Sequence, residues 1–217
     1  MQYRRIIYIL IILLSSVQRT SAQELRFSLG ALAGLSLSQI DGDNLQGYDH
    51  VGLMAGLNST AHITGRFSFS VELMYNQRGS KSNRLSNQNY LPTPLKVTTE
   101  YAEINALFHL LDWLHEQEKY YRLDAFAGVT IGKLIRTKIT DPTVRVENFN
   151  NIATEFNSTD LGFILGVGYK INRNWGWGLR FSRSLNKLFD AEKSRIASPV
   201  LRDWKAYFIA LYTFYTF

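Results

Sequence analysis

The most constraining feature of this chain is its last stretch, residues 204–217 (WKAYFIALYTFYTF), whose side chains alternate between two faces. Alternation with a period of two over this length predicts a β-strand, and aromatic residues favour strands. An apolar terminal strand in water would invite pairing with other chains, whereas closure of a barrel removes the free edge. We therefore expect this stretch to be the closing strand of a membrane barrel.

The end of that strand also resembles a known signal. An aromatic last residue, Phe217, with apolar residues such as Tyr215 at even spacings before it, is similar to the C-terminal recognition signal of bacterial outer-membrane barrels. The resemblance implies that Tyr215 and Phe217 form an assembly signal, and that the barrel-assembly machinery is a partner of this chain.

The first 22 residues have the three parts of a secretory signal peptide. Arg4 and Arg5 precede an apolar run from Ile6 to Leu14, and Thr20-Ser21-Ala22 offers a small-residue cleavage site. The run is too short for a spanning helix. We expect an exported protein whose residues 1–22 are a signal peptide and whose residues 23–217 form one barrel domain.

Composition excludes several classes of protein. Without the three arginines of residues 1–22 (Arg4, Arg5 and Arg19), 21 basic residues face 18 acidic ones, and the basic residues are scattered, so a nucleic-acid partner is not indicated. The absence of cysteine excludes a disulfide framework and zinc–cysteine sites. Because no apolar run reaches the length of a spanning helix, insertion into a membrane requires a barrel.

The rest of the chain divides into segments that alternate in the same way. Polar, glycine-containing connections separate them, and these connections are alternately long and short, as in outer-membrane barrels with short periplasmic turns and long extracellular loops. The predicted fold is an all-β, eight-stranded antiparallel transmembrane up-and-down barrel. Its predicted strands lie in 25–37, 51–63, 67–78, 101–110, 121–132, 160–170, 175–182 and 204–217, with a short helical or irregular connection over 112–119.

The position of the aromatic residues indicates which face meets lipid. On the apolar face, aromatic side chains gather at the periplasmic end of the predicted strands, as expected at a bilayer interface. A soluble ligand-binding barrel would have the opposite arrangement, with an apolar interior and a wet exterior. Its exterior could not include Trp175 and Trp177 without a severe risk of aggregation.

The opposite, polar face is predicted to line the lumen. It combines glycines with charges of both signs, and the glycines would make room for Phe126, Tyr212 and Phe214. Charges enclosed in so narrow a barrel are costly unless they pair, so we expect a charge network that closes the lumen. The residues assigned to it are Arg26, Glu72, Arg78, Glu100, Glu103, Arg122, Asp124, Asp160, Lys170 and Arg180.

Three stretches resemble the PorT-like outer-membrane β-barrel family. They are GALAGLSLSQIDGDNLQGYDHVGLMAGLNS, FSVELMYNQRGSK and LGFILGVGYKINRNWGWGLRFSRSLNKL, and the resemblance extends over nearly all of residues 23–217. It implies an outer-membrane location and, from the family's namesake, a link to protein secretion or gliding machinery; it supplies no catalytic residues. Ile104 is followed by Asn105 where the family commonly has proline, and a shift of one residue there would exchange the two faces of the strand.

An enzymatic alternative depends on the four histidines. Some outer-membrane barrels modify lipids with a serine, histidine and acid set, but the sequence predicts no such set beside His50, His62, His109 or His115. No GxSxG, HExxH, phosphate-loop or dinucleotide motif is present. No metal or cofactor is therefore expected.

The sequence thus favours a non-enzymatic scaffold that presents extracellular loops. Its expected partners are outer-membrane lipids, the barrel-assembly machinery and, through the long loops, secretion or other envelope proteins. A lipid-modifying barrel enzyme and a small channel are the alternatives.

Overall fold

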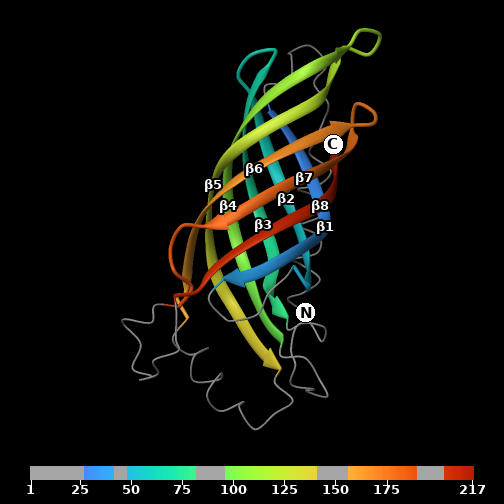
Figure 1. The fold of residues 1–217 in the computed structure, drawn as a ribbon. Helices are drawn as coiled ribbons and strands as arrows, with labels where there is room; N and C mark the ends of the chain where they lie inside the picture. Colours follow the sequence, from blue (N-terminus) through green and yellow to red (C-terminus); the bar gives the residue numbers. More distant parts are fainter. Residues whose placement is uncertain (1–26, 42–47, 82–95, 141–155, 190–202) are drawn as a thin grey trace, which may run out of the picture.

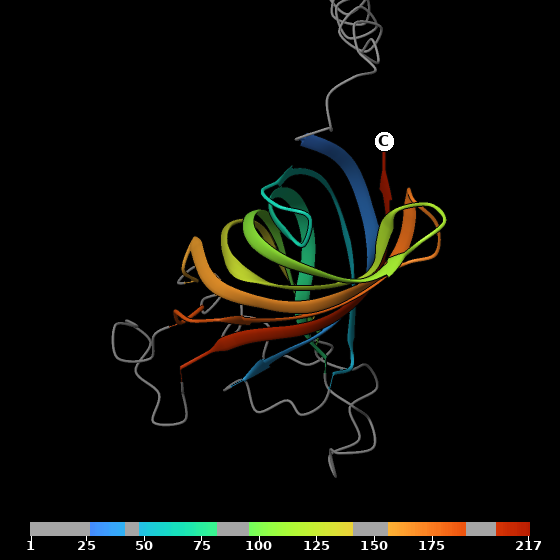
Figure 2. The same cartoon turned by 90° about the horizontal axis from the view of Figure 1, so that it is seen from above.

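The computed structural model describes residues 27–41, 48–81, 96–140, 156–189 and 203–217. The predicted signal peptide lies outside these residues. Within them, eight antiparallel strands form a closed barrel in sequence order, as the alternation predicts, and β8 pairs with β1 to complete the wall (Figures 1 and 2). The strands are β1 (Phe27–Asp41), β2 (His50–His62), β3 (Phe67–Lys81), β4 (Lys96–His115), β5 (Tyr120–Thr140), β6 (Thr159–Lys170), β7 (Trp175–Ser184) and β8 (Lys205–Thr216).

Burial alternates along the strands and separates an outer face from an inner one. On β6, Leu165 is 50% exposed while the preceding Ile164 is 1% exposed. The same contrast on β4 places Ile104 outside and Glu103 inside, which gives the fourth strand the faces expected from its sequence pattern. The exposed face is therefore the one that the sequence predicts to meet lipid, and the buried face lines the lumen.

The longest hairpin departs from the predicted boundaries. Residues 112–115 were expected in a helical or irregular connection, but they continue β4, and only residues 116–119 turn the chain. Pairing of β4 with β3 stops at Leu110, and pairing of β5 with β6 stops at Leu123. The hairpin tip consequently extends beyond its neighbours, because β4 and β5 satisfy each other's backbone hydrogen bonds there.

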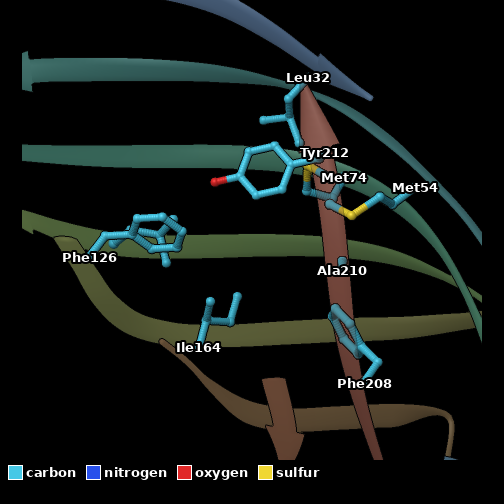
Figure 3. Packing of buried hydrophobic residues seen from close by; sticks show 9 residues of the cluster. Leu32, Met54, Met74, Phe126, Ile164, Phe208, Ala210 and Tyr212 are labelled. Carbon is cyan, nitrogen blue, oxygen red and sulfur yellow. The ribbon is translucent and has the colours of Figure 1, made fainter. Parts of the chain in front are cut away.

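Aromatic rings and glycines fill the middle of the lumen in complementary positions. Rings from β5 and β8 cross the interior, joined by aliphatic and methionine side chains from five other strands (Figure 3). A Cβ atom added at Gly166 would collide with Phe126, and one added at Gly178 would collide with Tyr212. Glycine is required at these two positions by the close approach of the rings, as the sequence predicts. The buried cluster comprises Leu32, Met54, Met74, Leu107, Phe126, Ile164, Phe208, Ala210 and Tyr212.

A second apolar cluster covers the lumen at the end with the long connections. Phe156, Leu188, Phe189 and Trp204 lie outside the eight strands, and all four are at most 8% exposed. Backbone hydrogen bonds join these segments, with Leu188 N donating to Trp204 O at 2.7 Å. The cluster packs onto the ends of β1, β4 and β8, at the end of the barrel predicted to be extracellular.

Candidate functional site

The first candidate site is a buried ion pair near the middle of the lumen. Arg180 on β7 reaches across the barrel to Glu72 on β3, with two parallel hydrogen bonds of 2.8 and 3.1 Å between its guanidinium and the carboxylate. Asn105 donates a further hydrogen bond to Glu72 at 2.9 Å. Both charged side chains are nearly inaccessible, so each depends on the other to offset the cost of burial.

A second centre lies closer to the extracellular end. The Arg78 guanidinium lies between two carboxylates, those of Glu103 and Asp160, and its distance to the latter is 2.6 Å. Asn76 donates to Glu103 at 3.1 Å and Ser184 donates to Asp160 at 3.0 Å. Five side chains from four strands are therefore tied together by one buried cation.

Aromatic rings enclose both guanidinium groups. The guanidinium carbon Cζ of Arg78 lies 4.9 Å from the Tyr101 ring centre and 4.8 Å from the Phe208 ring centre. Arg180 lies 4.3 Å from the Tyr212 ring centre. These cation–π contacts strengthen on desolvation and hold the arginines across the lumen. The two arginines, together with the rings that pack against Gly166 and Gly178, fill the interior at two levels.

The part of the lumen near the short turns carries a chain of hydrogen-bonded serine, histidine and aspartate side chains. His109 lies 2.9 Å from Asp124 through Nδ1 and 2.7 Å from the Ser70 hydroxyl through Nε2. His62 similarly connects Ser68, at 3.0 Å, with Ser28, at 3.2 Å. The sequence-based expectation that no histidine has a serine and a carboxylate beside it is therefore wrong for His109.

Three strands bring Ser70, His109 and Asp124 together although their sequence positions give no motif. In the β3–β4 register Ser68 is opposite His109, and in the β4–β5 register Leu111 is opposite Asp124. Ser70 and Asp124 are thus diagonal neighbours of His109 on the inner face. Only the strand register, combined with the shared inner face, would have revealed them.

Most of the predicted charge network lies in the lumen, with three exceptions. Glu72, Arg78, Glu103, Asp160 and Arg180 form the two buried centres, while Asp124 and Lys170 lie near each other at the periplasmic end. Arg26 lies outside the described residues.

The other two exceptions are corrections. Glu100 belongs to the outer face, opposite Gln77, because the buried Tyr101 and Thr99 on either side of it face inward. Arg122 was assigned to the network, but it donates instead to the Tyr169 hydroxyl at 3.4 Å and has no described carboxylate as a salt-bridge partner. Its position on the projecting hairpin, beyond the end of β5–β6 pairing, explains this difference.

The sequence also left out the neutral members of the two centres. These members occupy inward positions of their strands, so the two-residue period of each strand could have identified them as lumen residues. They are Asn76, Tyr101, Asn105 and Ser184. No group of histidine, cysteine and acidic residues suited to a metal ion occurs among the described residues. None of the described segments forms a helix long and apolar enough to cross a membrane.

A family model for the outer membrane protein beta-barrel domain matches residues 18–190. The chain belongs to this family. It is therefore an integral outer-membrane β-barrel protein. No curated protein matches its sequence.

Several solved outer-membrane barrels are similar to this β-barrel protein at low sequence identity. Ail, the attachment invasion locus protein of Yersinia pestis, has 12% identity and a TM-score of 0.45, over 89% of this chain and all of that one. Neisserial surface protein A has 11% identity and a TM-score of 0.45, over 88% of this chain and 97% of that one. Outer membrane protein W of Escherichia coli has 11% identity and a TM-score of 0.36, over 90% of this chain and all of that one.

The predicted assembly signal lies at the seam of the barrel. Tyr215 is paired with Ala31 on β1 and with Trp175 on β7, and the Phe217 amide donates to Leu29 O at 2.9 Å. Phe217 is 73% exposed, so its ring contributes little to packing within the barrel.

Deletion of Phe217 is expected to reduce insertion into the outer membrane while leaving export to the periplasm intact, because the seam loses one hydrogen bond and the predicted assembly signal loses its last residue. Fractionation and heat-modifiable gel migration measure both steps. A Phe217→Tyr variant, which keeps an aromatic terminus, serves as the control and should insert normally. Normal outer-membrane levels of the deletion variant would contradict the assignment of Tyr215 and Phe217 as an assembly signal.

Proposed function

We propose that this outer-membrane barrel is a non-enzymatic scaffold that acts by presenting its long extracellular connections, with a lumen that does not conduct. The observation that carries this proposal is the obstruction of the lumen at three levels. The Arg78–Asp160 and Arg180–Glu72 ion pairs join strands that are not neighbours, and an apolar cluster lies over the end of the lumen that carries the long connections. In a barrel of eight strands, the interior is only wide enough for such side chains.

A link to protein secretion or gliding machinery is the more specific part of the proposal. Its support is the resemblance of three stretches of the sequence to the PorT-like family. The expected partners are envelope proteins that contact the extracellular side, in addition to outer-membrane lipids and the barrel-assembly machinery.

One observation supports the alternative of a lipid-modifying enzyme, but two requirements of catalysis are not met. The hydrogen bonds among Ser70, His109 and Asp124 have the connectivity of a catalytic triad. However, Ser70 is fully buried, so a substrate carbonyl would not reach its hydroxyl. Ser70 also lies within β3, which is paired with β2 on one side and with β4 on the other. The backbone N–H groups that an oxyanion hole would need are therefore already used in strand pairing. We therefore assign these three residues a structural role.

The scaffold proposal is tested by cross-linking intact cells that carry an affinity-tagged chain and identifying the captured envelope proteins. A reproducible complex with components of a secretion system supports the specific link, and capture of other surface proteins supports the scaffold alone. Labelling of the folded barrel by a fluorophosphonate, lost in Ser70→Ala, would overturn the non-enzymatic assignment.

A further inference from the structure

A row of exposed aromatic side chains lies at the periplasmic end of the barrel, on β4, β6, β7 and β8. It begins at Trp113 on β4, whose ring centre lies 6.1 Å from that of Tyr169 on β6. Tyr169 is the strand partner of Trp177, and the Trp177 and Trp175 ring centres lie 6.1 Å apart. Trp175 is paired with Tyr215, which completes the row on β8.

Trp113 joins this row through an uncommon backbone conformation. Its φ angle is 59°, in the left-handed region that a bulky side chain rarely adopts. By strand alternation its side chain would follow His109 and Leu107 toward the barrel interior. Instead the indole is 60% exposed and lies against Tyr169, because the turn of the backbone re-aims it. The hairpin tip thus presents an apolar ring at the level of the outer aromatic belt.

Arg122 adds a positive charge to the same place. Its guanidinium donates to the Tyr169 hydroxyl, so one tyrosine contacts both the arginine and the Trp113 indole. The two buried centres of the lumen do not include Arg122, and none of the described carboxylates forms a salt bridge with it. A guanidinium held beside exposed aromatic rings leaves N–H groups available for an anion.

We propose that Arg122, Tyr169 and Trp113 form a binding site for the phosphate of a phospholipid in the periplasmic leaflet of the outer membrane. Arg122 donates charge-assisted hydrogen bonds to the phosphate, and the Tyr169 hydroxyl holds the guanidinium in place. The Trp113 indole packs against the glycerol and upper acyl region, at the depth where amphipathic rings reside in bilayers.

The identity of the ligand follows from the continuity of the site with the lipid face. Tyr169, Trp177 and Trp175 occupy outward positions, where the neighbouring side chains are the exposed aliphatic residues that meet acyl chains. A free phosphate ion would gain nothing from the aromatic row, whereas a phospholipid uses both the cation and the rings. A periplasmic protein would have to displace lipid from the same surface.

The experiment reconstitutes the folded full-length barrel in phosphatidylcholine vesicles with a minor fraction of phosphatidylglycerol. Phospholipid retained after detergent extraction is then counted by native mass spectrometry. Wild type should retain one phosphatidylglycerol, and Arg122→Gln should weaken its affinity roughly tenfold or more. Trp113→Leu should also weaken retention, since it keeps apolar bulk but removes the ring. Arg66→Gln is the matched control, because it removes an exposed cation from another turn at the same end and should leave retention unchanged.

Heat-modifiable migration establishes that each variant is folded, and Arg122→Lys provides a second test should Arg122→Gln fail to fold. With its charge but without the fork-shaped donors, the lysine variant should retain lipid at an intermediate level. Equal retention by wild type and both Arg122 variants would overturn the site. Complete displacement of phosphatidylglycerol by inorganic phosphate would also overturn it, because the ligand would then be the free ion.

Discussion

Replacing Arg180 by methionine is expected to destabilise the barrel by about 3–5 kcal/mol, because it leaves the Glu72 carboxylate buried without its partner. Glu72 receives two of its three described side-chain hydrogen bonds from Arg180. Only the Asn105 amide would remain, and its neutral donor does not compensate a full negative charge. Unfolding in urea from lipid vesicles, followed by tryptophan fluorescence, measures the free energy of unfolding.

Two further variants separate the loss of pairing from the loss of packing. The double variant Arg180→Met with Glu72→Leu removes both charges and should recover most of the lost stability, since well-packed apolar residues replace buried ion pairs at little cost. Arg173→Met, at an exposed turn position, should change stability by no more than about 0.5 kcal/mol. A single Arg180→Met variant as stable as this control would show that the ion pair is not buried as described.

An arginine in place of Leu165 is expected to cost roughly 2–4 kcal/mol in a bilayer, because this half-exposed side chain points outward near the midplane. The aromatic row lies at one end of the strands and the long connections lie at the other, which places Leu165 between the two interfaces. The cost arises from moving a charge into hydrocarbon without a partner.

Leu161→Arg is the matched control on the same face of the same strand. It lies four residues closer to the extracellular end, a displacement of roughly 13 Å along the strand, where a lipid-facing arginine costs roughly 0–1 kcal/mol. Both variants are compared by urea unfolding in vesicles of one lipid composition. If Leu165→Arg unfolds like wild type, the outer face has been assigned to the wrong side of the strand.

The two faces of the barrel could be predicted because a two-residue period is a local property of each strand. Gly166 and Gly178 were likewise predictable as space for Phe126 and Tyr212, since a narrow lumen must balance large and small side chains. Glu100 shows the limit of this reasoning. It was placed inside together with Glu103, although residues three apart on a regular strand face opposite sides.

The features that could not be predicted depend on register and on the ends of strands. Ser70, His109 and Asp124 meet only because three strands align with a particular offset, which no single segment encodes. Arg122 lies outside the lumen because β5 extends beyond Leu123, the last of its residues at that end to pair with β6. An alternating pattern does not show how far a strand extends past its neighbour. Trp113 leaves the inward face because of one left-handed residue. The segment around Trp113, residues 106–122, contains no glycine or proline that would indicate a turn. The outward position of the Trp113 side chain could therefore not be inferred from the sequence.

Conductance of the purified protein in planar bilayers tests the central claim, that the lumen is closed by its own side chains. We expect no stable, reproducible current from wild-type protein, because the Arg78 and Arg180 centres and the apolar extracellular cluster lie in series along the lumen. Protein recovered from the same bilayer preparation must show the heat-modifiable migration of a folded barrel, so that silence is not due to unfolding. A steady open channel in wild type, with an ion selectivity that changes in Glu72→Gln, would contradict the closed scaffold and establish a pore.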